Sequence, residues 1–343
     1  MKKFKILKQR FFLGLVLLCG AVLFTWAGNS FSQEAPELWL VPEIVQASDV
    51  VVIPPDVIGR MDVIFTPPPE PPPPRTPRLE ALTAEYIDTL TNFNYLTNRV
   101  FLVDPETILL PSDINVHNFL EADMSIDTTV DGPQVLIFHT HSTEMFIDSN
   151  PAYPMTGVMG VGRYLAQILA TYHGIETLHY TGRFDIVENR SRIQGSYERM
   201  EPVIRQILAD NPSIQLVIDL HRDGVRDHVP AFVHYVDGVP AAQIMFFNGL
   251  SRQNRNGQAV DIHRLPNPYQ TENLNFSFRL QLAANQLYPG LARRIYLRQF
   301  RYSLHMMPLS TLVEVGNQHN TQQQAKNAMH HLANIIAEVV LEY

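Results

Sequence analysis

Short apolar runs alternate with helical patterns in the middle of the chain, and this alternation constrains the fold more than any other feature. Three runs have the length of buried strands: residues 135–138, 176–181 and 214–221. Helical periodicity fills the segments between them, 160–174 and 196–212. Strands that alternate with helices are joined by crossover connections, which make them parallel and place helices on the faces of the sheet. The sequence therefore predicts an α/β domain with three layers, in which helices flank a mainly parallel central sheet.

The flanking segments complete this domain. A short helical pattern between Leu82 and Leu96 precedes the first strand and is expected to pack onto the domain. Farther along, Asp237–Gly238 separates two strand-like runs and predicts a hairpin turn. A helix near Asn273–Leu287, a strand at 310–316 and an amphipathic helix from Thr321 to about Glu342 follow.

Polar side chains follow three of the predicted strands at the points where those strands end. Because the carboxyl ends of parallel strands meet at one edge of a sheet, these side chains are expected to converge. His141 and Glu144 follow the first strand, and His221 ends the third. Two histidines and one carboxylate can hold Zn2+ and leave a fourth position open for water, although an isolated histidine at a strand end is more often structural. The sequence thus indicates a candidate zinc site.

Glu314 lies between Val313 and Val315 in the strand at 310–316. A carboxylate in a buried strand is costly to ionise without a partner, so it is either functional or paired. As a functional group, it would take a proton from zinc-bound water and pass it to a leaving nitrogen. As a structural group, it would pair with Arg222.

Asp219 and Asp223 flank His221 in the same segment. Either carboxylate could orient a histidine ligand by accepting its second ring N–H.

The N-terminus predicts a membrane anchor. The first ten residues carry five Lys or Arg and no acidic residue, and the uncharged stretch Phe11–Gly28 is close to the length that spans a bilayer. We favour an uncleaved anchor at 1–28 over a cleaved signal peptide, with its basic end in the cytoplasm and the remainder outside. The proline-rich segment 29–78 predicts a disordered spacer, and 79–343 the catalytic domain.

The amino-acid composition indicates which classes of partner the chain can bind. The net charge is -8 and the isoelectric point is near 5.9, and basic residues form no stripe beyond the N-terminus. Nucleic acid is therefore not expected as a partner. The single cysteine, Cys19, lies in the apolar stretch, so no disulfide can form within the chain.

Several long motifs in the chain resemble the stage II sporulation protein P family. The resemblance runs from about residue 80 to the C-terminus and rests on NYLTNRVFLVDPETILL, GPQVLIFHTHSTEMFIDS, NPSIQLVIDLHRDGV, IMFFNGLSR, YPGLARRIYL and LVEVGNQHNT. It implies a membrane-anchored cell-wall hydrolase of endospore engulfment, with a domain similar to zinc N-acetylmuramoyl-L-alanine amidases. Both amidase and endopeptidase activity on peptidoglycan are implied, together with stage II sporulation proteins D and M as partners.

The resemblance also assigns roles to residues. His141, Glu144 and His221 match the metal positions of the family, and Glu314 matches its catalytic glutamate. His139 matches a common histidine, for which we expect a place beside the metal ligands, as for Asp219, Arg222 and Asp223. Two other interpretations remain: a scaffold protein that binds the cell wall without cleaving it, and a zinc carboxypeptidase.

Overall fold

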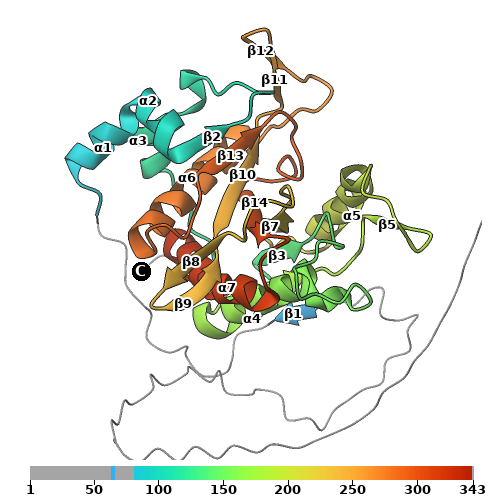
Figure 1. Ribbon diagram of the computed structural model, residues 1–343. Coiled ribbons are helices and arrows are strands. Elements are labelled where there is room, and N and C mark those ends of the chain that lie inside the picture. Colours follow the sequence, from blue (N-terminus) through green and yellow to red (C-terminus); the bar gives the residue numbers. More distant parts are fainter. Residues whose placement is uncertain (1–62, 66–80, 342–343) are drawn as a thin grey trace, which may run out of the picture. The chain divides into compact units, whose positions relative to one another are not determined.

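An eight-stranded sheet forms the centre of the molecule (Figure 1). The computed structural model describes residues 63–65 and 81–341. The strands lie in the order β1 (Val63–Phe65), β4 (Thr177–His179), β3 (Val135–Phe138), β7 (Leu216–Asp223), β14 (Ser310–Asn317), β10 (Ile244–Gly249), β13 (Ile295–Arg298) and β2 (Phe101–Val103). Only the pairs β1–β4 and β14–β10 are antiparallel in this sheet. The predicted, mainly parallel sheet is therefore confirmed.

Helices cover both faces of this sheet. On one face lie α4 (Val158–His173), α6 (Gln270–Leu287) and α7 (Gln322–Val340), whose apolar side chains share one core with alternate residues of the strands. On the other face lies α5 (Ser196–Asp210), which buries Met200 and Ile204 against Phe138. Figure 1 shows α5 and α6 on opposite sides of the strands. The three-layer arrangement predicted from the sequence is thus present.

The remaining elements are short. They are α1 (Ala84–Thr91), α2 (Phe93–Tyr95), η1 (Leu96–Val100), η2 (Pro111–Asp113), α3 (Val116–Glu121), η3 (Pro154–Thr156) and the hairpins β5–β6 (Ile186–Val187, Arg190–Ser191), β8–β9 (Val233–Val236, Val239–Ala242) and β11–β12 (Arg252–Arg255, Gln258–Asp261). The predicted N-terminal helix is split among α1, α2 and η1 because Asn92 is extended and caps α2.

Local chemistry fixes the ends of the long helices. Gly174 ends α4 with φ 66°, in the left-handed region that glycine adopts most readily. Thr321 begins α7 with a capping box, in which its hydroxyl accepts from the Gln324 amide and the Gln324 side chain accepts in return. The predicted end of α4 and the predicted start of α7 are therefore confirmed, whereas α4 begins at Val158, two residues before its predicted start.

The segment after the Asp237–Gly238 turn differs from its predicted form. The turn itself is a hairpin, with φ 51° at Asp237 and 79° at Gly238, and it joins β8 to β9. After β9 the chain leaves the hairpin and forms β10, a central strand antiparallel to β14. Every residue of β10 is buried. A strand buried on both faces is a continuous apolar run, which explains why IMFF does not alternate as a hairpin strand would.

The N-terminal predictions concern residues that are mostly outside the described part of the chain. The predicted anchor, 1–28, lies entirely outside it, and of the predicted spacer only β1 is described, as an edge strand paired with β4. None of the described helices has both the length and the apolar character needed to cross a membrane.

Candidate active site

The three strands with polar ends are neighbours in the sheet. β7 lies between β3 and β14, and Glu314 of β14 is the direct cross-strand partner of His221 of β7. Side chains alternate along a strand, so His221 shares one face with Glu314 and with Asp219, two residues before it. This is the face that α5 covers, because Phe138, the partner of Asp219, packs against that helix. The sheet register thus brings an imidazole and two carboxylates together.

The turn after β3 brings the remaining predicted ligands to the same place. The ring centroids of His141 and His221 lie 5.3 Å apart, and Glu144 Oε2 lies 3.4 Å from His221 Nδ1. His141 Nδ1 is buried and has no hydrogen-bond partner. Across residues 63–65 and 81–341, no three histidine, cysteine or carboxylate side chains are close enough together to hold a metal ion. The three candidate ligands therefore lie near one another but farther apart than the ligands of a formed metal site. The ring nitrogen Nδ1 of His141 has no hydrogen-bond partner among the described residues.

Arg222 holds this turn against β7. Its backbone N–H donates to Glu144 Oε2 at 2.8 Å, and its side-chain Nε donates to the carbonyl oxygen of Met145 at 3.0 Å. The sequence interpretation that pairs Arg222 with Glu314 differs from the structure, in which the described residues contain no such ion pair. The reason is strand alternation: Arg222 follows His221, so it points away from the face that carries Glu314.

Asp219 is buried and fully engaged. It accepts hydrogen bonds from the Thr140 backbone N–H at 2.9 Å and from the Thr140 hydroxyl at 2.7 Å. His221 Nε2 lies 2.7 Å from Asp219 Oδ1, a close ion-pair contact that is not aligned as a hydrogen bond. Burial opposes the charge on His221, yet the carboxylates of Asp219 and Glu144 raise its pKa well above the ordinary value. Asp219 thus orients the His221 ring so that Nδ1 faces Glu144.

Among the carboxyl groups of the described residues, Glu314 has the pKa that departs most from its ordinary value. Burial raises its pKa to about 8, and the charges of Glu144 and Asp223 act in the same direction, whereas those of His221 and Arg293 oppose it. Its Oε2 is buried and has no hydrogen-bond partner. Beside it, Arg293 Nη2 is bound to Asp223 Oδ2 at 2.6 Å. A carboxyl group that changes protonation near neutral pH suits proton transfer.

His139 lies on the other face of the sheet, under α4. Its Nδ1 lies 2.7 Å from the carbonyl oxygen of Leu220, which can only accept, so Nδ1 carries the proton. Its Nε2 must then accept from His179 Nε2, 2.9 Å away. Gly162 of α4 leaves room for this pair, since a Cβ there would lie 2.5 Å from the His139 ring. His139 therefore contacts the backbone next to His221 and does not face the candidate ligands.

Asp185 was not among the residues singled out from the sequence, although it braces the turn that carries His141 and Glu144. It accepts from the Ser142 hydroxyl at 2.5 Å, from the Thr143 amide at 2.8 Å and from the Thr143 hydroxyl at 2.5 Å. Burial raises its pKa, but these hydrogen bonds outweigh that effect and hold the pKa below the usual value. Its position shortly after the strand at 176–181 was the available signal, because the other candidate residues also follow strand ends.

Comparison with known proteins identifies the family. The family model described as Stage II sporulation protein P (SpoIIP) matches residues 99–337. The chain belongs to the stage II sporulation protein P family. A curated member, Stage II sporulation protein P of Bacillus subtilis (strain 168), is 23% identical over 237 residues, which cover 64% of this chain and 54% of that protein. This SpoIIP-family chain therefore spans about half the length of the curated relative that it matches.

Solved structures with weaker similarity to this SpoIIP-family chain include two amidases and a carboxypeptidase. The N-acetylmuramoyl-L-alanine amidase of Clostridium difficile 630 is 12% identical, with a TM-score of 0.34 and coverage of 61% of this chain and 94% of that one. The CwlD amidase of Clostridioides difficile, solved with the GerS lipoprotein, is 11% identical, with a TM-score of 0.35 and coverage of 60% and 92%. A metallo-carboxypeptidase of Burkholderia cenocepacia is 8% identical, with a TM-score of 0.31 and coverage of 62% and 58%.

Replacing Asp185 tests the brace on the turn. Asp185→Asn should lower the free energy of unfolding at pH 7 by about 1.5–3 kcal/mol, because the hydrogen bonds that it weakens end on a charged group. The folded-state pKa of Asp185 is depressed, so its contribution is present above the unfolded carboxyl pKa and is lost as the pH falls through the folded value. Denaturant unfolding of the variant and the wild type at pH 7 and in acid measures this difference.

Asp131→Asn, at an exposed position, is the matched control and should leave the free energy of unfolding nearly unchanged at both pH values. A difference between the Asp185 variant and the wild type that does not narrow in acid would contradict the account.

Proposed function

We propose that this protein is a zinc-dependent peptidoglycan hydrolase that cleaves the amide between N-acetylmuramic acid and L-alanine, and peptide cross-links as a second reaction. One observation carries the proposal: His141, Glu144 and His221 lie near one another at the ends of adjacent strands, beside Glu314, whose pKa is raised to about 8. Membership in the SpoIIP family supports the cell wall as the substrate.

The donor set suits Zn2+. Two imidazoles and one carboxylate are the ligands of many catalytic zinc sites, and three protein ligands leave a position for water. The buried Nδ1 of His141, which has no hydrogen-bond partner, supports this role, and His221 Nδ1 faces Glu144. When bound, the ion would lower the pKa of water toward about 7 and polarise the amide carbonyl.

Glu314 would carry the proton through the reaction. It takes a proton from water as the water oxygen bonds to the carbonyl carbon, and it passes that proton to the nitrogen as the carbon–nitrogen bond breaks. The products are a carboxylate and an amine. A cation held by His141, Glu144 and His221 would lower the pKa of Glu314 from about 8, so that the base form is populated at neutral pH.

We further propose that the protein acts outside the cytoplasm during endospore engulfment. Residues 1–28 would anchor it in the cell membrane, and 29–78 would hold the catalytic domain, 79–343, near the cell wall. Stage II sporulation proteins D and M are proposed partners on the basis of family membership.

Product analysis tests the reaction. Full-length protein incubated with purified sacculi should release intact stem peptides and leave glycan strands with free muramoyl groups, which mass spectrometry identifies. A chelator should stop the release, and added Zn2+ should restore it. Loss of only the terminal residue of stem peptides would instead indicate a carboxypeptidase, and unchanged sacculi would indicate a scaffold.

Glu314→Gln tests the proton carrier. The variant keeps the shape of the side chain and should keep bound zinc, whereas turnover should fall by at least about a hundredfold, since general acid–base groups contribute roughly 10²–10⁴-fold. Zinc content, melting temperature and sacculus digestion are measured on one preparation.

Glu272→Gln, an exposed substitution on α6, is the control and should digest sacculi as the wild type does. If the Glu314 variant retains metal and fold and digests sacculi at nearly the normal rate, Glu314 has no catalytic role.

A further inference from the structure

Tyr197 is the residue of α5 that meets the candidate active site. It is the second residue of the helix, which begins after Gly195 at φ 79°. Its ring stands edge-on to the His141 ring, with a centroid separation of 5.6 Å and an interplanar angle of 86°. Tyr197 is not among the residues predicted from the sequence, but its ring lies against a candidate ligand.

The hydroxyl of Tyr197 is not committed elsewhere. The side chain is only partly buried, and no described residue forms a hydrogen bond with its hydroxyl. A tyrosine hydroxyl keeps its proton at neutral pH because its ordinary pKa is about 10, and the carboxylates of Asp219 and Glu314 lie near it. Tyr197 thus presents an O–H donor beside the carboxylates of the site.

The two arginines beside the site already donate to protein oxygens, although Arg293 Nε has no hydrogen-bond partner among the described residues. Arg222 donates to Met145 O and Asp223 O, and Arg293 donates to the Asp223 carboxylate. The carboxylates Glu144, Asp219 and Glu314 can only accept when ionised. Negative charge that develops on a substrate oxygen among these groups needs a donor, and Tyr197 is placed to supply one.

A loop on the opposite side holds the Tyr197 ring in place. Tyr302, in the connection between β13 and β14, packs edge-on against Tyr197 at 5.5 Å and against Phe247 at 4.7 Å. Tyr302 has φ 51°, and Gly249 permits the close approach of this loop, because a Cβ there would lie 1.9 Å from the Phe300 carbonyl oxygen. The ring of Tyr197 is therefore fixed between Tyr302 and His141.

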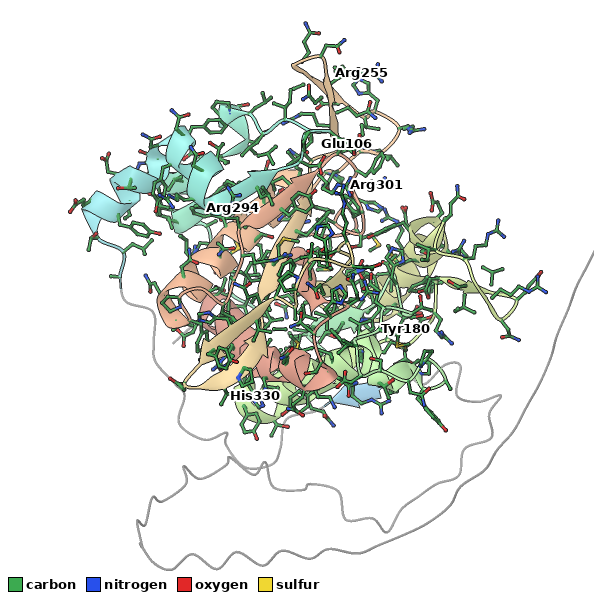
Figure 2. The ribbon with its side chains drawn as sticks, viewed as in Figure 1. Glu106, Tyr180, Arg255, Arg294, Arg301 and His330 are labelled. Atoms are coloured by element: carbon green, nitrogen blue, oxygen red, sulfur yellow. The ribbon has the colours of Figure 1, made fainter. Side chains whose placement is uncertain are left out.

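Ion pairs tie the same loop to α5. Glu201 lies one helical turn after Tyr197, on the same face of the helix. Its two carboxylate oxygens contact Arg301 Nη2 at 2.7 Å and His305 Nε2 at 2.9 Å. Figure 2 shows Arg301 on the side of the loop that is nearer to α5. The helix that carries Tyr197 and the loop that packs on its ring are thus joined by contacts that do not use the Tyr197 hydroxyl.

We propose that Tyr197 is a further catalytic residue, whose hydroxyl donates a hydrogen bond to the carbonyl oxygen of the scissile amide. The inference rests on the proposed hydrolase function. As water adds to the carbonyl carbon, the π electron pair of the C=O bond moves to oxygen, and Tyr197 stabilises that oxygen without releasing its own proton. Glu314 alone carries the transferred proton to the leaving nitrogen. Tyr197 therefore acts at the carbonyl oxygen, and Glu314 acts at the nitrogen.

Tyr197→Phe separates the hydroxyl from the ring. The variant keeps the contacts with His141 and Tyr302, so zinc affinity and the melting temperature should match those of the wild type. Turnover of a soluble muropeptide should fall on the order of 10²-fold in kcat, as when one oxyanion donor is removed, with little change in KM. If the ring served only to position His141, this variant would behave as the wild type.

Tyr164→Phe is the matched control. The Tyr164 hydroxyl lies 2.7 Å from His330 Nε2, in a contact between α4 and α7, and Figure 2 shows His330 near the lower edge of the part of the chain drawn with side chains. Its removal should leave kcat unchanged. Equal kcat values for the wild type, the Tyr164 variant and the Tyr197 variant would overturn the proposal.

Binding of a phosphinate analogue of the muramoyl amide gives a second measurement. Its tetrahedral oxygens imitate the charged oxygen of the reaction, so the zinc-loaded Tyr197 variant should bind it more weakly than the wild type, by a factor similar to the loss in kcat. Equal affinities would overturn the role of Tyr197 and leave the hydrolase function intact. A wild-type protein that neither cleaves the muropeptide nor binds the phosphinate would overturn both.

Discussion

The cross-strand pairing of Glu314 with His221 is the contact on which the site depends. The two residues lie on adjacent parallel strands, β14 and β7, and the register places them on the same face. A shift of one residue in either strand would turn one side chain to the opposite face. Buried neighbours such as Val313 and Leu220 fix that register, because they fill the core on the α4, α6 and α7 side. The packing of the core and the chemistry of the site are therefore set by the same alternation.

Each side of the site is then held by a separate set of contacts. The turn with His141 and Glu144 is braced by Asp185, which follows β4, and by Arg222, which belongs to β7. Asp219 orients His221 and is itself fixed by Thr140. None of these bracing groups needs to react, so the structure separates the residues that hold the site from Glu314, the residue proposed to move a proton.

Four strands of the sheet, β3, β4, β7 and β14, and the four central polar residues could be predicted from the sequence for a physical reason, whereas β1, β2 and β13 were not predicted. Buried parallel strands are continuous apolar runs, and their carboxyl ends must meet at one edge, so the polar residues that follow them converge wherever the helices pack. Long-range partners could not be predicted in this way. Arg222 is next to His221 in sequence but faces the other side, and Tyr197 reaches the site from a helix, where the sequence carries no signal of a nearby ligand. The Asp237–Gly238 turn is a strong local signal that predicts a hairpin, whereas the pairing of β10 with β14 is not local and could not be predicted.

Anomalous X-ray scattering at the zinc edge from crystals of the zinc-loaded protein would locate the metal ion directly. We expect one strong peak at the ends of β3 and β7, bonded to His141, Glu144 and His221, with Glu314 close by but outside bonding distance. A peak bonded to Glu314, or one centred away from these three side chains, would contradict this expectation.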